Sequence, residues 1–225
     1  SMPQIMRLLI SRPKILYIAA TDGRYGGAMA VGDGIRGVGA SQKYLDINTP
    51  LNEWVEITSS FRPDIIIGYP SAIKILGELV QQGKVQVGVK RVISCGEPLS
   101  PGLRRFLKDV FRTEVVNFYG ASESLALGVE TGHEEGMVLF DDLNLIEVEN
   151  GAMYLTSLYN FAQPLIRYRI SDHLALKESL VGSPFTRAEI LLGRDEDILW
   201  FEDGKGGRDF LHPLAVEGFC VEGLK

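Results

Sequence analysis

The chain has 225 residues, of which 45% are hydrophobic and 23% charged, and its formal net charge is −6. This composition is that of a globular protein with one large or two small domains, and it excludes a disordered chain. The acidic balance and the lack of a basic tract argue against nucleic acid as the main partner. No apolar run is long enough to cross a bilayer and no signal peptide is visible, so the sequence predicts a cytoplasmic protein with no membrane partner.

Residues 14–20, KILYIAA, predict a buried strand, and the glycine-rich segment 23–39 follows it. Within this segment residues 32–37 match the pattern GxGxxG. A dinucleotide fingerprint requires glycines that come directly after a strand, whereas here about a dozen residues intervene. We therefore expect a closely packed helix or loop in this segment, and another short strand at residues 43–47.

From Thr49 onwards the sequence alternates between helical and strand patterns. The caps, the helical spacing of apolar residues and the apolar runs predict three helices and three strands. In chain order these are helix 49–62, strand 64–68, helix 70–83, strand 91–95, a helix from Ser100 to about residue 110, and strand 115–119. Such alternation indicates right-handed βαβ crossovers and a mainly parallel sheet that helices cover on both faces.

Polar residues and glycines follow the last two of these strands. Gly96-Glu97-Pro98 comes after one strand, and Gly120, Ser122 and Glu123 come after the other. Ligands of open parallel sheets bind outside the carboxyl ends of the strands, which predicts a ligand site here. Taken alone, the second segment is more typical of an ordinary strand-to-loop turn than of a ligand site.

The only cysteines, Cys95 and Cys220, give no disulfide framework, and the three histidines are too scattered for a zinc site. Cys95 ends an apolar run and has no histidine near it in sequence. We expect Cys95 to be a packing residue at a strand end, with a pKa raised by its apolar neighbours, and not a nucleophile.

Beyond Glu123 the pattern changes to antiparallel β-structure. Residues 136–149 and 152–159 predict two strands that flank Asn150-Gly151, a strong hairpin signal. Further strands are predicted at residues 165–170, 190–192 and 198–201. The predicted fold class is therefore α/β, with a mainly parallel sheet covered by helices and then a smaller antiparallel, β-barrel-like subdomain.

The segments SCGEPLSPGL (94–103) and NFYGASE (117–123) resemble two neighbouring core motifs of the adenylate-forming enzymes. This superfamily comprises acyl-CoA ligases, peptide-synthetase adenylation domains and firefly-type luciferases. The segment RPDIIIGYPSAIKILGEL (62–79) is similar to the corresponding stretch of the phenylacetate-CoA ligase and capsule-biosynthesis branch.

The resemblance implies a role for each residue of the two motifs. Tyr119 would lie against adenine, Ser122 would donate a hydrogen bond to the α-phosphate, and Glu123 would bind the Mg²⁺ that accompanies ATP. Ser122 and Glu123 would thus be the catalytic pair. These roles suit an aromatic face, a hydroxyl and a carboxylate, respectively. The other cofactor-binding residues implied by these motifs are Gly96, Glu97, Pro98 and Gly120.

Two further motifs resemble the family in the expected order. PLIRYRISD (164–172) is similar to Tyr-Arg-Thr-Gly-Asp, in which Asp172 would accept hydrogen bonds from both ribose hydroxyls. Ser171 replaces the glycine of the motif, which restricts the backbone before Asp172; an aspartate that closes a turn after a strand is the alternative interpretation. GRDEDIL (193–199) resembles the hinge motif Gly-Arg-x-Asp-Asp, in which Arg194 would reach the ribose or a phosphate.

Two family features are not found in the sequence: the Ser/Thr/Gly-rich phosphate loop and the small C-terminal domain with its adenylation lysine. The chain therefore resembles an internal part of an adenylate-forming enzyme. The implied domains are a partial α/β nucleotide-binding subdomain at residues 3–130, a β-rich subdomain at 131–192, and the hinge with the start of a C-terminal domain at 193–225.

The leading hypothesis is that the chain supplies the adenine, ribose and Mg²⁺ site of an ATP-dependent ligase that activates a small carboxylic acid as acyl-AMP, with coenzyme A as the thiol acceptor. On its own the chain is expected to be inactive. The alternative is a non-catalytic adenine-nucleotide-binding module. A serine hydrolase is disfavoured, because Ser122 lacks the second glycine of a nucleophile elbow. Candidate walls of the acid pocket are Tyr69, Cys95, Asn117 and Phe118.

Overall fold

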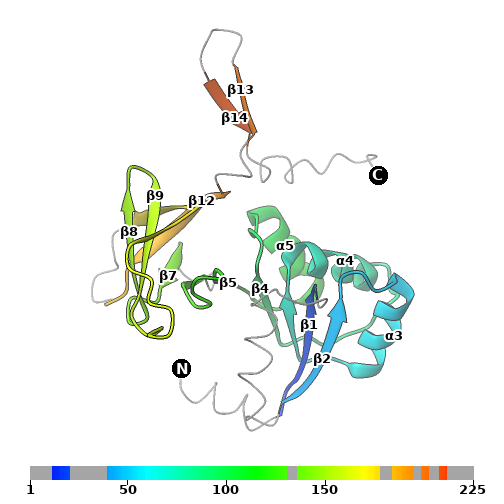
Figure 1. Ribbon diagram of the computed structural model, residues 1–225. Helices are drawn as coiled ribbons and strands as arrows, with labels where there is room; N and C mark the ends of the chain where they lie inside the picture. The colour runs from blue at the N-terminus through cyan, green and yellow to red at the C-terminus, as the bar shows by residue number, and fades with distance from the viewer. Residues whose placement is uncertain are drawn as a thin grey trace. The chain divides into compact units, whose positions relative to one another are not determined.

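The computed structural model describes residues 12–20, 40–130, 136–177, 184–194, 199–202 and 208–211, the last two ranges and residues 190–194 by their backbone. The chain divides into two compact units, Ser1–Ala126 and Leu127–Lys225 (Figure 1). The segment with GxGxxG, residues 195–198 of the hinge motif, and Cys220 lie outside the described residues. The domain boundaries expected at residues 130 and 192 remain predictions.

The strands of the first unit run parallel, in the order β5-β4-β3-β1-β2. This is the strand order of a doubly wound sheet that reverses direction between β1 and β3. The predicted strands are confirmed to within two residues. They are β1 (Lys14–Ala19), β2 (Ser41–Asp46), β3 (Ile65–Gly68), β4 (Arg91–Cys95) and β5 (Val115–Tyr119).

Three helices cover one face of this sheet, namely α3 (Leu51–Phe61), α4 (Pro70–Gln81) and α5 (Pro101–Phe111) (Figure 1). Their apolar sides pack on alternate strand residues such as Leu16, Ile66 and Val92, which are fully buried. The opposite face carries a second buried cluster around Tyr17 and Ile67. None of the described helices packs against that second face, so the predicted covering of both faces is seen on one face in this part of the chain.

The ends of the helices follow the signals in the sequence. Ser100 caps α5, because its Oγ accepts a hydrogen bond from the Leu103 N–H at 3.2 Å, and Pro101 occupies the first turn. Helix α3 ends at Phe61, and Arg62 adopts a left-handed conformation (φ 51°) just before Pro63. A residue before proline disfavours the helical conformation, which explains the stop.

Asp64 joins three segments at the amino-terminal edge of the sheet. Its Oδ2 accepts a hydrogen bond from the Lys14 N–H at 2.9 Å, and its Oδ1 lies 2.7 Å from Lys90 Nζ. Burial alone would raise the pKa of this carboxyl, but the hydrogen bonds from Lys14 and Lys90 outweigh it and lower the pKa below the usual value. Asp64 therefore aligns β1 and β3 with the segment that enters β4.

The second unit consists of antiparallel strands, as predicted. One sheet has the order β10-β9-β8, the strands β11, β12, β7 and β6 pair in that order, and β13 pairs with β14. Their bounds are β6 (Gly128–Glu130), β7 (Met137–Leu139), β8 (Asn144–Glu149), β9 (Ala152–Ser157), β10 (Tyr168–Ile170), β11 (Asp172–Lys177), β12 (Arg187–Arg194), β13 (Leu199–Glu202) and β14 (Arg208–Leu211).

The turn between β8 and β9 is confirmed, with φ of 51° at Asn150 and 80° at Gly151. The prediction for residues 136–149 is wrong. Residues 136–149 are not one strand, because a turn in which the N–H groups of Leu143 and Asn144 bond to the Phe140 carbonyl separates β7 from β8. Asp172 follows β10 after one intervening residue and begins β11, a strand that the sequence did not predict.

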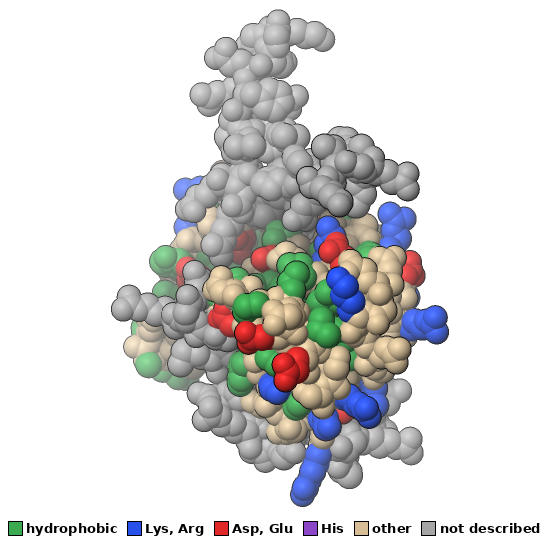
Figure 2. Space-filling view, turned by 90° about the vertical axis from the view of Figure 1, so that its right-hand side faces the viewer, with side chains coloured by type: hydrophobic (Ala, Val, Ile, Leu, Met, Phe, Trp, Pro, Cys, Tyr) green, Lys and Arg blue, Asp and Glu red, His purple; other side chains and the backbone are tan. Residues whose placement is uncertain are grey.

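The face seen in Figure 2, on the side where α3 and α4 lie in Figure 1, carries interspersed acidic and basic side chains. In the first unit, exposed or partly exposed ion pairs form between Lys74 and Glu78 (3.8 Å) and between Lys108 and Glu114 (2.8 Å). In the described part of the chain no helix is long and apolar enough to span a membrane.

We predict that Asp64→Asn lowers the free energy of unfolding at pH 7 by about 1 kcal/mol, because it removes a charged acceptor at a partly exposed site. The folded pKa of Asp64 is lowered, so its contribution is present above the unfolded pKa and is lost as pH falls through the folded pKa. Urea unfolding should show a difference from wild type at neutral pH that vanishes in acid. Exposed Glu56→Gln is the matched control, and an equal loss in both variants would contradict the role of Asp64.

Candidate functional site

The loops that carry the predicted nucleotide residues leave neighbouring parallel strands at the same sheet edge. Gly68 pairs with Ser94 and Cys95 pairs with Phe118, so Tyr69, Gly96 and Tyr119 follow at adjacent strand ends. The structure thus brings the predicted loops after β4 and β5 together. It adds the loop after β3 as their neighbour.

The loop after β4 is fastened to the start of α4. Glu97 Oε2 accepts a hydrogen bond from the Ser71 N–H at 3.2 Å, where the partial positive charge of the helix N-terminus favours a carboxylate. Gly96 has a φ of 82°, and a Cβ on it would lie 2.7 Å from Cε1 of Tyr69. Gly96 is therefore required both by its backbone conformation and by the Tyr69 ring. Gly96, Glu97 and Pro98 are exposed to solvent.

The loop after β5 folds back on itself. The Ala121 N–H bonds to the Ser124 carbonyl at 2.9 Å, and Ser124 is 2% exposed. A Cβ on Gly120 would lie 2.3 Å from the Leu125 carbonyl oxygen, so the closed loop requires glycine there. Ser122 is exposed and Glu123 half-buried. The loop holds the two predicted catalytic residues at the surface beyond β5.

The donor set at Glu123 bears on the expected magnesium ion. Among the described residues no three His, Cys, Asp or Glu side chains gather into a metal site. Mg²⁺ is usually bound through one or two carboxylates together with substrate phosphates and waters. A single accessible carboxylate fits an ion that arrives with a nucleotide and does not fit an all-protein metal cage.

Cys95 lies on the sheet beside this edge, with its Sγ 3.8 Å from the Gly68 carbonyl oxygen. Burial, and secondarily the charge of Glu97, raises the pKa of the thiol to about 11. The predicted pKa shift is confirmed, and its main cause is the predicted one. The thiol is poorly suited to nucleophilic chemistry near neutral pH.

The two remaining predicted site residues lie in the second unit. Asp172 is half-buried at the start of β11 and pairs with Arg194 at the end of β12, where a register shift between Asp172 and Leu174 interrupts the ladder. Two motifs assigned separately in the sequence are therefore directly opposite each other on antiparallel strands. No signal in the sequence indicates this pairing, because β11 itself was not predicted.

Comparison with known families supports the resemblance that the sequence motifs indicate. A sequence profile of the AMP-binding enzyme family matches residues 36–141, which include both loops of the first unit. Just under half of the chain therefore resembles this family of adenylate-forming enzymes.

Two relatives are similar in sequence to part of the chain. The chain is 30% identical to the indoleacetate–lysine synthetase of Pseudomonas savastanoi over 137 residues, which cover 58% of the chain and 34% of the synthetase. It is 28% identical to the phenylacetate-coenzyme A ligase of Aromatoleum evansii over 163 residues, or 64% of the chain and 37% of that ligase. The chain therefore spans about a third of the length of these relatives.

The fold is also that of a solved ligase. A crystal structure of 2-hydroxyisobutyryl-CoA ligase in the postadenylation state, in complex with R3-HIB-AMP, superposes with a TM-score of 0.76 at 21% identity. The match covers 95% of this chain and 49% of that ligase. At this identity the likeness concerns the fold, and it confirms the predicted α/β class.

We predict that Gly120→Ala destabilises the protein by about 1–3 kcal/mol, because the new methyl group must displace the Leu125 carbonyl. Gly102→Ala is the matched control, since Gly102 is an exposed residue of α5 and its Cβ would meet nothing within 4 Å. Thermal unfolding of both variants checks the prediction. Equal stability of the two variants would show that the loop tolerates a Cβ.

We predict slow alkylation of Cys95 in the folded chain. With a pKa of about 11, the thiolate fraction at pH 8 is about 10⁻³, against about 0.2 for an ordinary cysteine. In a Cys220→Ser background, iodoacetamide should therefore react at least about 100-fold more slowly with the folded chain than with the chain in urea. Similar rates in both states would exclude a buried packing role.

Proposed function

We propose that the chain forms the adenine-, ribose- and metal-binding part of an ATP-dependent ligase. This ligase would activate a small carboxylic acid as acyl-AMP and transfer the acyl group to a thiol, with coenzyme A as the acceptor. The observation that carries the proposal is the exit of the two nucleotide loops from neighbouring parallel strands β4 and β5. The match to the AMP-binding enzyme family includes both loops, which supports a common nucleotide ligand for them.

Each residue then has a distinct task. The ring of Tyr119 stacks on adenine beside the loop Gly96–Pro98, and the Ser122 hydroxyl donates a hydrogen bond to the α-phosphate. Asp172 accepts hydrogen bonds from the ribose diol, and Arg194 reaches the ribose or a phosphate. Glu123 would hold Mg²⁺, which supplies charge neutralisation of the phosphates when bound. The remaining contribution of the chain is positioning of the reactants.

The names of the relatives support a carboxylic acid as the substrate, whereas coenzyme A as the acceptor has to be tested by experiment. Two are named for arylacetates, indoleacetate and phenylacetate, and the solved ligase is named for a hydroxy acid. We propose a small carboxylic acid that binds near Tyr69, Cys95, Asn117 and Phe118. The non-catalytic alternative is a module that binds adenine nucleotides without any transfer.

We predict that the chain binds AMP weakly, and that Asp172→Ala reduces the affinity at least tenfold, about what the loss of charged hydrogen bonds to a diol costs. Isothermal titration measures both values. Exposed Asp142→Ala in the same unit is the control and should bind like wild type. Absence of heat with AMP up to millimolar concentration would contradict the nucleotide site.

Pyrophosphate exchange, measured with the same protein, tests catalysis separately from binding. We expect no acid-dependent exchange of labelled pyrophosphate into ATP, because the sequence holds no phosphate loop and each missing charge-stabilising donor costs about 3 kcal/mol of transition-state binding. Exchange above a no-protein control would show that other groups of this chain hold the β- and γ-phosphates.

A further inference from the structure

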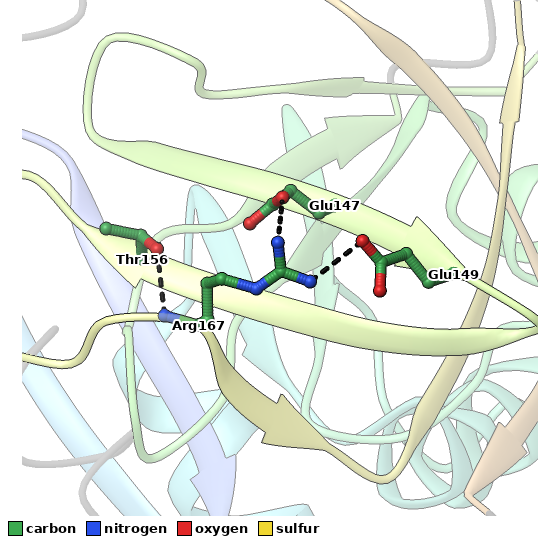
Figure 3. Close-up of polar contacts among 4 residues, drawn as sticks. All are labelled: Glu147, Glu149, Thr156 and Arg167. Carbon is green, nitrogen blue, oxygen red and sulfur yellow. Dashed lines mark hydrogen bonds and ion pairs between the residues drawn. The ribbon is translucent and has the colours of Figure 1, made fainter.

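One arginine spans the three-stranded sheet of the second unit. Arg167 precedes β10, and its guanidinium reaches over the sheet to β8, where Nη1 lies 3.0 Å from Glu147 Oε1 and Nη2 lies 2.8 Å from Glu149 Oε1 (Figure 3). On the way it passes 5.2 Å from the centre of the Tyr154 ring on β9. A single side chain therefore connects all three strands.

The backbone of Arg167 is fixed as well. Its φ is 49°, a left-handed conformation that residues with a side chain rarely adopt. Its N–H donates a hydrogen bond to Thr156 Oγ1 at 3.0 Å (Figure 3), and next to it the Ser157 N–H bonds to the Leu165 carbonyl at 3.0 Å. Contacts of both backbone and side chain hold the residue in this unusual conformation.

The strand that Arg167 introduces is short and leads directly to Asp172. β10 has three residues and pairs only with β9, so few backbone hydrogen bonds hold it. One residue, Ser171, separates β10 from β11, which begins at Asp172 and pairs with β12. Contacts that fix the start of β10 therefore also fix the backbone that leads to Asp172.

Stability alone is a weak explanation for this arrangement. The side chains of Arg167 and Glu149 are about half exposed, at 48% and 53%, and ion pairs in water contribute little to folding. The contacts of Arg167 instead have a common geometric effect, because together they fix the start of β10 relative to β8 and β9.

We propose that Arg167 is a positioning residue of the ribose subsite, which holds β10 so that Asp172 meets the ribose diol. This inference rests on the proposed nucleotide site. Direct binding of a nucleotide phosphate by Arg167 is the competing role. Two carboxylates already occupy the guanidinium and would repel a phosphate, which favours positioning.

The test uses the full chain and four variants: Arg167→Ala, Arg167→Lys, the double variant Glu147→Gln/Glu149→Gln, and Lys177→Ala. The last breaks another exposed ion pair of this unit, with Glu189 at 3.2 Å, and serves as the control. Amide hydrogen exchange at residues 168–172 reports on the position of the strand without any ligand. Titration with AMP and with adenosine, which has no phosphate, reports on the subsite.

If Arg167 positions Asp172, exchange at residues 168–172 becomes about tenfold faster in Arg167→Ala and in the double glutamate variant, but not in the control. Both variants should also bind AMP and adenosine about five- to tenfold more weakly, and by the same factor for each ligand. Arg167→Lys should fall between wild type and Arg167→Ala, because an ammonium cannot bridge both carboxylates with the same geometry.

Other results overturn the proposal. Unchanged exchange in Arg167→Ala would exclude a hold on the strand. Direct phosphate binding would instead weaken AMP but not adenosine in Arg167→Ala, and would strengthen AMP binding in the double glutamate variant. Faster exchange together with a wild-type chain that binds neither AMP nor adenosine would refute the proposed nucleotide site while supporting the hold of Arg167 on the strand.

Discussion

Parallel pairing of β3, β4 and β5 is the constraint on which the first unit depends. Each crossover helix returns the chain to the edge of the sheet where the parallel strands begin. The loops that follow these strands therefore all leave the sheet at its opposite, carboxyl-terminal edge. The strand interiors face apolar layers and cannot carry polar ligand-binding groups without cost. Charged and solvent-accessible groups that could bind a ligand are therefore found at the strand exits, as Glu97, Ser122 and Glu123 are.

The glycines of these loops have a structural requirement besides any ligand. Gly96 is fixed by a positive φ and by the ring of Tyr69, and Gly120 by the Leu125 carbonyl. Close approach of backbone to side chain or carbonyl restricts the conformations that both loops of the proposed nucleotide site can adopt. Such preorganisation reduces the ordering entropy that a ligand must otherwise overcome.

In the second unit, side-chain contacts hold a segment that has few backbone hydrogen bonds. A residue with a side chain in the left-handed conformation lowers the stability of the fold by roughly 1 kcal/mol, which is comparable to the net contribution of one hydrogen bond. At Arg167 the backbone hydrogen bond to Thr156 offsets this cost, and the two glutamates hold the side chain in place. The arrangement fixes a three-residue strand that the ladder alone would hold weakly.

The sequence by itself determined the alternation of strands and helices, the Ser100 cap and the hairpin at Asn150-Gly151, because these signals depend on neighbours a few residues apart. Tertiary structure alone decided that Ser71 meets Glu97, that Asp172 pairs with Arg194, and that residues 136–149 form two strands. These contacts join positions that are distant in the chain or depend on which strand lies alongside. Pairing of that kind is set by the packing of the whole sheet and leaves no periodic mark in the sequence.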